Sequence, residues 1–276
     1  EEEEIAEPGL TPCGPKSVRV LHIATSLMTG GAEVMLQKVA RALRESGYNV
    51  FVTSLTSLST IGAELQRERF PVVALGGRGG ILLPHQLGRL MRTYRAVRPD
   101  IVHSWMYHAN VVSHMLVKFS RASLRPALVT SVRGALHAPE TQKLPLRILR
   151  SIDARLSRRA DAVVFNSWRS AEQHVNMGYT AEKSTVIPNC FDTDAFSPNQ
   201  DDRERVRSEL GCPKGLLVGL VARFHPVKDH RTFLEAAAIV RREVTDYRFL
   251  LAGRGCDSGN ERLTRWVAEL GLTDRV

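Results

Sequence analysis

Short hydrophobic runs alternate with longer amphipathic segments along most of the chain. The runs are rich in β-branched residues and predict buried strands, whereas the segments with apolar residues at helical spacing predict helices. Predicted strands cover residues 18–24, 50–55, 72–75, 101–104, 127–132, 162–165 and 185–187. The helices between them begin at Gly30-Gly31 and then cover about residues 61–69, 84–97, 108–119, 145–159 and 168–177.

This alternation predicts an α/β fold with a parallel sheet that helices cover on both faces. The seven strands make one complete doubly wound domain over residues 16–187. Residues 188–215 break the rhythm, with one short helical piece, and are interpreted as an interdomain connection. A second α/β unit starts at residue 216. It has strands at 216–222 and 248–252 and helices at 230–242 and 260–270. Because two strands make a poor sheet alone, residues 216–276 are interpreted as the first part of a domain.

The composition narrows the class of protein. The 276 residues are 43% hydrophobic and 24% charged, which excludes a disordered chain, a collagen-like repeat and a disulfide miniprotein. No apolar stretch reaches about 18 residues, so no transmembrane helix is predicted. The four cysteines are far apart and form no CxxC, which favours a reducing cytoplasm. Residues 1–15 are expected to be a disordered acidic tail, and the missing initiator Met suggests a processed or partial chain.

Positive charge is concentrated in the middle of the chain. The formal net charge is +9, and residues 78–159 hold 15 Lys and Arg against three acids. Arg89, Arg92 and Arg95 lie near the apolar stripe of the helix predicted at 84–97. Such a patch attracts phosphates, nucleic acid or an anionic membrane surface, unless it is simply a solvated basic face. The sequence lacks the interleaved aromatic and basic residues of nucleic-acid binders, so no nucleic-acid partner is expected.

A glycine pair follows the first strand. Gly30 and Gly31 open the next helix, where the backbone can approach a ligand closely and helix N–H groups are free. Ligands of open α/β sheets bind beyond the carboxyl ends of the strands. The motif therefore predicts a site for an anionic group such as phosphate. A tight turn before a helix is the simpler alternative, and a GxGxxG fingerprint is absent.

Two cations follow the first strand of the second unit. Arg223 leaves the strand and Lys228 precedes the next helix, five residues later. Arg offers a planar fork and Lys a mobile point charge, a combination suited to a diphosphate. Stabilising a departing diphosphate is an effective catalytic device because charge grows there in the transition state. The alternative is two unrelated surface cations.

Two histidines are expected at the edge of the first domain where the glycine pair lies. His103 ends one predicted strand and His108 begins the next helix, which makes both candidates for substrate binding. A zinc site would need a closer set with carboxylates or thiols, and none is found. His22, within the first strand, is expected to be buried with its hydrogen bonds satisfied.

Six motifs in order resemble retaining glycosyltransferases of family 4, which have the GT-B fold. They are GGAE, DIVHSWMYHAN, ADAVVFNS, VIPNCFDTDAFSP, GLVARFHPVKDH and FLLAGRG, and the resemblance runs from about residue 18 to the last residue. It implies two Rossmann-like domains and transfer of a sugar from a nucleotide-sugar donor with retained configuration, without a metal or other cofactor. It also implies a glycan or lipid-linked acceptor and a cytoplasmic enzyme, with peripheral contact at the inner face of an anionic membrane.

The resemblance also implies roles for individual residues. Gly30 and Gly31 match the glycine loop that faces the donor phosphates and the acceptor. Arg223 and Lys228 match the basic pair that binds the donor diphosphate. Asn166 and Ser167 match a family motif at a strand end near the cleft, and Asn166 is a candidate for substrate binding.

Two departures from the family pattern matter. Many members carry a His after the fifth strand, where this chain has Arg133, with His137 four residues later. Arg133 is therefore a candidate for substrate binding. The chain also ends before the loop with paired Glu residues that completes the family's donor site, so a C-terminally truncated enzyme is expected. The alternative function is a non-catalytic module that binds a sugar nucleotide or phosphate, or an inactive fragment of such an enzyme.

Overall fold

The computed structural model describes residues 18–120, 125–134, 136, 144–212, 214–243 and 247–276. The predicted tail at 1–15 and His137 lie outside the described residues. The chain divides into two compact units, Glu1–Phe191 and Asp192–Val276, and the division falls within residues 188–215.

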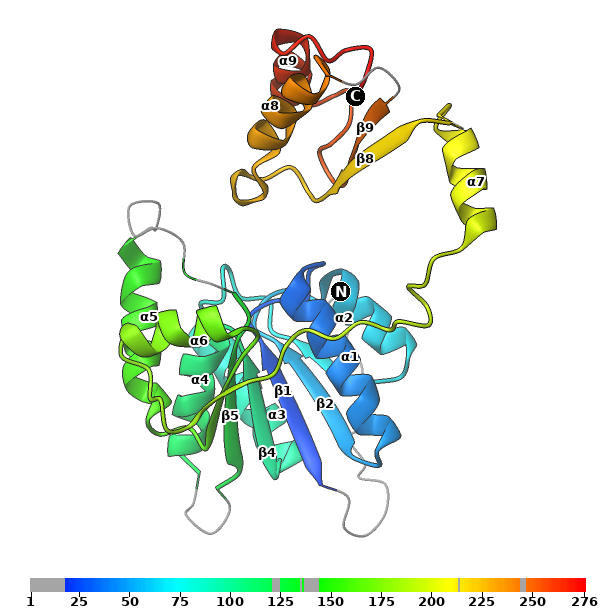
Figure 1. Ribbon diagram of the computed structural model, residues 1–276. Helices are drawn as coiled ribbons and strands as arrows, with labels where there is room; N and C mark the ends of the chain where they lie inside the picture. Colours follow the sequence, from blue (N-terminus) through cyan, green and yellow to red (C-terminus); the bar gives the residue numbers. More distant parts are fainter. Residues whose placement is uncertain (1–17, 121–124, 135, 137–143, 213, 244–246) are drawn as a thin grey trace, which may run out of the picture. The chain divides into compact units, whose positions relative to one another are not determined.

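Unit 1 is built on a seven-stranded sheet with the order β3-β2-β1-β4-β5-β6-β7, in which all neighbours are parallel (Figure 1). The strands are β1 Arg19–Ala24, β2 Asn49–Ser54, β3 Val72–Ala74, β4 Ile101–Trp105, β5 Ala127–Val132, β6 Ala162–Phe165 and β7 Ser184–Val186. The order reverses between β1 and β4, which is where ligands bind in folds of this kind. The prediction of a doubly wound α/β domain is confirmed.

Helices cover both faces of this sheet because the strands alternate their side chains. The helices are α1 Gly31–Glu45, α2 Ser59–Arg67, α3 Pro84–Val97, α4 Tyr107–Lys118, α5 Leu144–Ser157 and α6 Trp168–Asn176. Leu21 and Ile23 of β1 pack with α3 and α4 in one apolar cluster, while Ala24 packs with α1 and α2 in another. A third cluster joins α4, α5 and α6 to β5 and β6. This arrangement leaves the carboxyl ends of the strands free for the site.

Unit 2 begins with α7 Gln200–Glu209, which is the predicted short helical piece. Its sheet has two parallel strands, β8 Leu216–Val221 and β9 Tyr247–Ala252. The helices α8 His230–Val240 and α9 Glu261–Glu269 pack on it through buried side chains that include Leu234, Phe249 and Leu263. In the described part of the chain, no helix is long and apolar enough to cross a membrane.

Candidate functional site

The predicted residues of unit 1 follow the carboxyl ends of four parallel strands. Gly30 and Gly31 come after β1, His108 after β4, Arg133 after β5 and Asn166 after β6, while His103 lies within β4. Since parallel strands end at the same edge of a sheet, these residues share one edge of unit 1. They fall into three groups: the aromatic rings around His103, the contact of His108 with a glycine loop, and the glycine pair at the start of α1.

His103 is the centre of the ring cluster. Its Nε2 lies 2.7 Å from the hydroxyl of Ser131, and its ring centroid is 4.6 Å from that of Trp105 and 5.2 Å from that of His22. Burial, and then the nearby His22 and Arg133, hold the pKa of His103 well below its usual range. A neutral His103 can accept or donate one hydrogen bond but brings no charge to the site.

His22 lies beneath this cluster. It is fully buried, and its Nδ1 accepts a hydrogen bond of 3.1 Å from Nε1 of Trp105. The prediction that His22 is buried is confirmed, but the expectation that it is satisfied is only half right, because Nε2 has no partner among the described residues. Burial lowers the pKa of His22 to about 4.

Arg133 carries the positive charge of this edge. It donates 2.9 Å to Oδ1 of Asn189 and 3.4 Å to the carbonyl of Ile187, and its guanidinium lies 5.5 Å from the centroid of the Trp105 ring. None of these groups is a carboxylate, and burial lowers the pKa of Arg133. The side chain therefore holds the segment after β7 in place, and its charge has no carboxylate partner among the described residues.

Two polar atoms at this edge are buried without a partner among the described residues. They are Nε of Arg133 and Oδ1 of Asn166. Buried polar atoms are nearly always hydrogen-bonded in folded proteins, so unpaired ones call for an explanation. One donor and one acceptor at a common strand edge fit a polar substrate or water that is held there.

His108 is packed against a loop that the sequence analysis missed. A Cβ on Gly80, whose φ is +86°, would lie only 2.9 Å from Cγ of His108 and 3.1 Å from Cγ2 of Thr25. The loop at 76–80 therefore approaches the start of α4 as bare backbone. Its sequence, GGRGG after the third strand, is the signal that could have revealed it. Burial lowers the pKa of His108.

The position of α4 is held by strained backbone and a buried polar chain. Met106, just before α4, has φ 74° and ψ 162°, a region that side chains rarely adopt. Ser104 Oγ donates 2.7 Å to Oδ1 of Asn110, whose Nδ2 donates 2.9 Å to Asp153 of α5. These contacts determine where α4 starts, and with it the place of His108.

The glycine pair has two different structural settings. Gly30 is extended, and a Cβ there would overlap the carboxylate of Glu33, which accepts 2.9 Å from the hydroxyl of Ser26. Gly31 is exposed, and a Cβ there would meet nothing within 4 Å. No side chain caps α1, so its first N–H groups are open to a ligand. A side chain at Gly30 would have to displace the flexible end of Glu33, whereas one at Gly31 would not, and a ligand role for either glycine stays a prediction.

The imidazole of His103 is expected to stay neutral through the pH range around 6.5 in which an exposed histidine takes up a proton. Its folded pKa lies below the unfolded value near 6.5, so its contribution to stability is present above about pH 6.5 and is lost as the pH falls. NMR titration of the ring carbons measures this, with the urea-unfolded chain as the control that titrates normally. A titration step of folded His103 inside that range would contradict the cluster described above.

In unit 2, Arg223 and Lys228 lie on the connection from β8 to α8. Arg223 is the second residue after β8, and Lys228 ends a 3₁₀ turn, Pro226–Lys228, directly before α8. Both are exposed, and neither side chain forms a hydrogen bond or ion pair within the described ranges. The turn, closed by a 2.8 Å hydrogen bond from Lys228 N to His225 O, keeps the two charges on one short connection.

The backbone beside Arg223 is held by the glycines after β9. Gly253 has φ +150°, and a Cβ on it would lie 2.9 Å from the Arg223 nitrogen and even closer to the Ala222 carbonyl. The nitrogen of Phe224 donates 2.9 Å to the carbonyl of Arg254. The AGRG motif therefore serves close backbone packing that fixes the start of the cation-bearing connection.

The amino end of α8 is already occupied by a carboxylate. Asp229, with φ 50°, caps the helix and accepts 3.3 Å from the nitrogen of Thr232. Because the carboxylate already accepts a hydrogen bond from a backbone N–H and brings negative charge to this helix end, a phosphate would bind there less well. Arg223 and Lys228, rather than the end of α8, are thus the anion-attracting groups of this connection.

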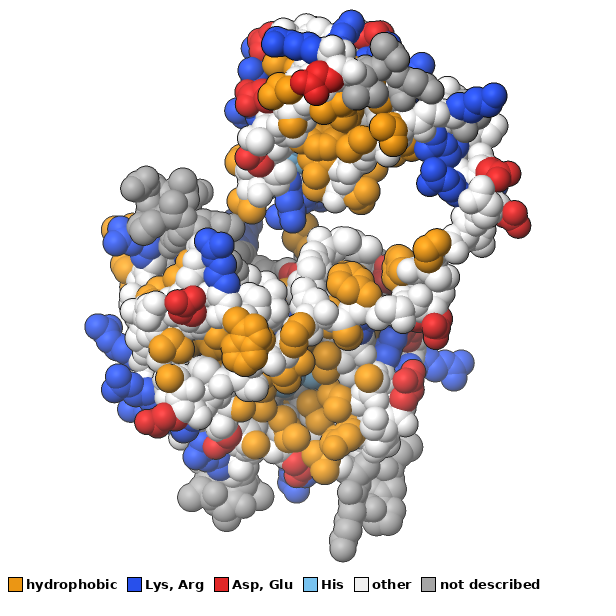
Figure 2. All heavy atoms as spheres, viewed as in Figure 1, with side chains coloured by type: hydrophobic (Ala, Val, Ile, Leu, Met, Phe, Trp, Pro, Cys, Tyr) orange, Lys and Arg blue, Asp and Glu red, His pale blue; other side chains and the backbone are white. Residues whose placement is uncertain are grey.

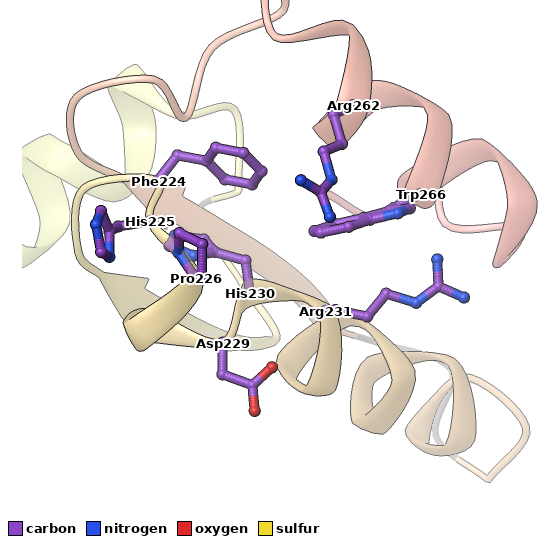
Figure 3. A pocket seen from close by; sticks show the side chains of 8 residues that line it. All are labelled: Phe224, His225, Pro226, Asp229, His230, Arg231, Arg262 and Trp266. Atoms are coloured by element: carbon purple, nitrogen blue, oxygen red, sulfur yellow. The ribbon is translucent and has the colours of Figure 1, made fainter. Parts of the chain in front are cut away.

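A pocket of about 270 Å³ lies next to this connection (Figure 3). It is lined by Phe224, His225, Pro226, Asp229, His230, Arg231, Arg262 and Trp266, and not by the two predicted cations. Arg231 is paired with Glu235 and Glu269, and Arg262 lies 4.8 Å from the centroid of the Trp266 ring. In neither unit do three His, Cys, Asp or Glu side chains of the described residues gather as a metal site would need.

Comparisons with known proteins agree with this architecture. The sequence model of Glycosyltransferase Family 4 matches residues 29–195. The D-inositol 3-phosphate glycosyltransferase of Nocardia farcinica is 27% identical, over 99% of this chain and 61% of that protein. The putative glycosyltransferase EpsF of Bacillus subtilis is 25% identical, over 94% of this chain and 69% of that protein. The chain spans about three fifths of the length of the inositol phosphate relatives it matches.

Solved structures share the fold. Anabaena Alr3699/HepE in complex with UDP has a TM-score of 0.77 at 22% identity, covering 94% of this chain and 68% of that chain. A glycosyltransferase from Rickettsia africae has a TM-score of 0.73 at 18% identity, covering 95% and 67%. The predicted GT-B type of α/β fold is confirmed. Because the family model matches more than half of its residues, the chain belongs to glycosyltransferase family 4.

Proposed function

We propose that the protein carrying this chain is a glycosyltransferase that moves a sugar from a nucleotide-sugar donor to an acceptor with retention of configuration. The observation that carries the proposal is the pair Arg223 and Lys228 on one short connection. Both are exposed, and neither has a carboxylate partner among the described residues. Family membership supports the transferase class, and the related fold of HepE was determined with UDP and with UDP-glucose.

The proposed chemistry is electrostatic. As the bond from the sugar to the phosphate breaks, negative charge grows on the departing nucleoside diphosphate. Arg223 donates through its planar fork and Lys228 supplies a mobile charge, so both stabilise the leaving group more than the intact donor. These cations take the place that a metal ion has in other transferases, and no metal is expected.

The acceptor is assigned to the sheet edge of unit 1. Arg133 and Asn166 offer a buried donor and a buried acceptor that lack partners among the described residues, and neutral His103 adds a further polar group. We propose that these groups and His108 orient a glycan or lipid-linked glycan, with Gly30 and Gly31 leaving room for phosphate. The attacking hydroxyl passes its proton to the leaving phosphate oxygen, so no protein nucleophile is required.

A panel of nucleoside diphosphates tests the donor half of this proposal. UDP, GDP and ADP are each added to the protein expressed from its complete reading frame while its thermal unfolding is followed. A ligand that binds only the folded state raises the melting temperature in proportion to the logarithm of its concentration. We expect one of them to do so, and Arg223→Ala with Lys228→Ala to remove the shift.

The matched control is Arg242→Ala with Arg265→Ala, which removes the same charge from exposed positions of unit 2. If that pair removed the shift equally, general charge and not a diphosphate site would explain binding. If no nucleotide shifted the wild-type chain, the donor proposal would fail for these residues. Binding without sugar transfer by the protein expressed from its complete reading frame would favour the non-catalytic module.

A further inference from the structure

One helix of unit 1 exposes an apolar stripe. Leu144, Ile148 and Ile152 of α5 are 64%, 53% and 39% exposed. They are spaced by four residues, so they lie one above another along the same side of the helix. Isolated exposed apolar residues are ordinary, but an aligned set on one helix marks an interaction surface.

The opposite side of α5 faces the core. Asp153 and Ala154 are buried, and Asp153 accepts hydrogen bonds from Asn110 and Tyr179. Ser157 is buried as well and accepts 3.0 Å from the nitrogen of Thr180. The helix is therefore fixed by its inner side, which leaves the apolar stripe turned outward.

Arginines flank and extend this stripe. Arg147, Arg155, Arg158 and Arg159 of the α5 region are all exposed, and none forms an ion pair with a described residue. Arg155 and Arg159 follow Ile152 at helical spacing and so continue the outward face. We call Leu144, Ile148, Ile152 and these four arginines the α5 face. In Figure 2, basic and hydrophobic side chains lie close together along the edge that α5 forms in Figure 1.

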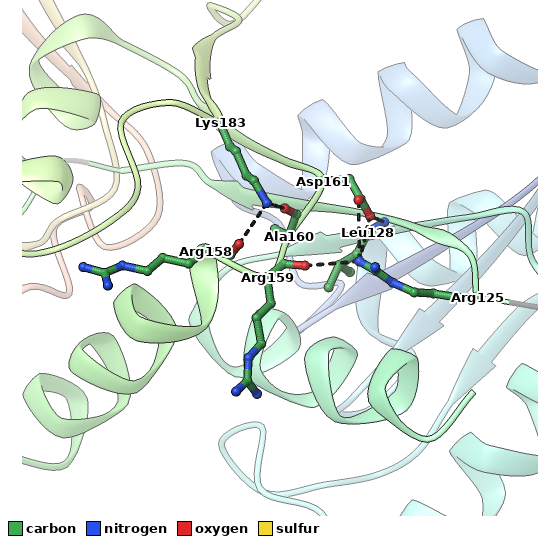
Figure 4. A network of polar contacts seen from close by, with 7 residues as sticks. All are labelled: Arg125, Leu128, Arg158, Arg159, Ala160, Asp161 and Lys183. Carbon is green, nitrogen blue, oxygen red and sulfur yellow. Dashed lines mark hydrogen bonds and ion pairs between the residues drawn. The ribbon is translucent and has the colours of Figure 1, made fainter. Parts of the chain in front are cut away.

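The carboxyl end of α5 is anchored without using these arginine side chains (Figure 4). Lys183 donates 2.8 Å to the backbone carbonyls of Arg158 and Ala160. Arg125 donates 3.3 Å to the carbonyl of Arg159 and pairs with Asp161, the one acid drawn there. The backbone is thus held in place while the guanidinium groups of Arg158 and Arg159 remain free to meet an external anion.

We infer that the α5 face docks the protein on a lipid bilayer with anionic headgroups. A helix with an apolar stripe bordered by arginines lies in a membrane interface, where the stripe enters the headgroup boundary and the cations meet lipid phosphates. Nucleic acid would meet the arginines but leave the isoleucines in water, whereas a lipid interface supplies both phosphates and an apolar boundary. The charge of residues 78–159 led to the expectation of a membrane contact. The inference assigns that contact to one surface and does not depend on sugar transfer.

The structure favours α5 over α3, the helix whose arginines and apolar stripe the sequence had indicated. Leu90, Tyr94 and Val97 of α3 are buried in the core, and Leu87 is the one large hydrophobic side chain of that helix that is exposed, at 43%. Arg92 and Arg95 are exposed on α3, without an ion pair to a described residue. They carry the same charge as Arg155 and Arg159 and provide a matched control.

Co-sedimentation of the chain with phosphatidylcholine vesicles, with and without phosphatidylglycerol, tests the inference at low and high salt. We expect binding only to the anionic vesicles, weakened by salt. Arg155→Gln with Arg159→Gln is expected to weaken it about 30-fold, and Ile148→Ser with Ile152→Ser about tenfold or more. Arg92→Gln with Arg95→Gln is expected to change it much less. Circular dichroism checks that each variant is folded.

Each outcome decides a separate point. Equal binding by the α5 variants and wild type, or a larger loss in the α3 pair, overturns the assignment to α5 while a membrane contact stands. If the arginine variant lost vesicle binding and the isoleucine variant did not, the apolar stripe would not enter the bilayer, and a soluble polyanion would be the favoured partner. No binding of the wild type to anionic vesicles overturns the membrane contact itself. The nucleotide screen reports on the transferase proposal independently.

Discussion

Alanine in place of Arg223 or Lys228 is expected to lower the turnover number about 30- to 1,000-fold. The two cations share one short connection and have no carboxylate partner among the described residues, so their charge is free to act on a diphosphate. Because negative charge grows there as the sugar bond breaks, each should contribute more to the transition state than to donor binding. Steady-state kinetics of both variants, in the protein expressed from its complete reading frame, measure this.

The control for this experiment is Arg242→Ala, an exposed arginine of unit 2 that forms no ion pair with a described residue. It should leave both kinetic constants close to those of the wild type. The double variant should lose less than the product of the two single losses if the cations act as one clamp. Variants that kept their turnover number and changed only the donor Michaelis constant would mean that the pair merely binds the donor.

Valine in place of Gly31 is expected to reduce transfer by at least about 1,000-fold while the fold stays intact. A Cβ at this position meets nothing within 4 Å, so the protein itself has room for the side chain. The space it would fill lies at the uncapped start of α1, where the proposal places phosphate. Circular dichroism and a transfer assay on the same preparation separate folding from function.

Gly88→Val is the matched control, because Gly88 is an exposed helical glycine of α3 with nothing within 4 Å of an added Cβ. It makes the same Gly→Val change at an exposed helical position and should retain transfer. Gly30→Val would be a poor probe, since the side chain would disturb Glu33 within the protein. If Gly31→Val turned over like the wild type, the glycine would serve only the turn before α1.

The elements of both units were predictable because their patterns are local. The helix predicted at 84–97 is α3, Pro84–Val97, and the strands predicted at 127–132 and 162–165 are β5 and β6. The spacing of apolar residues and the Pro at the start of α3 carry this information within a few residues. Errors elsewhere amount to a residue or two at the ends, as in β8, which stops at Val221.

The contacts of the candidate site were not predictable, because they join residues that are far apart in the chain. Arg133 reaches Asn189, and the loop with Gly80 closes on His108. The cap of α8 was not predicted either: the carboxylate of Asp229 accepts from the nitrogen of Thr232 at the helix end where a phosphate would bind. No pattern in a single sequence states which distant strand ends will become neighbours.

Residue type and short-range spacing were enough to predict the alternation of strands and helices, the concentration of basic residues and the motifs of the family. The folded chain was needed to show which side of each amphipathic helix packs on the core. Folding buried Leu90, Tyr94 and Val97 of α3, and it turned Ile148 of α5 outward beside exposed arginines that form no ion pair with a described residue. It also buried atoms of Arg133 and Asn166 without partners among the described residues. Burial depends on what packs above a residue, and that is a property of the folded chain as a whole.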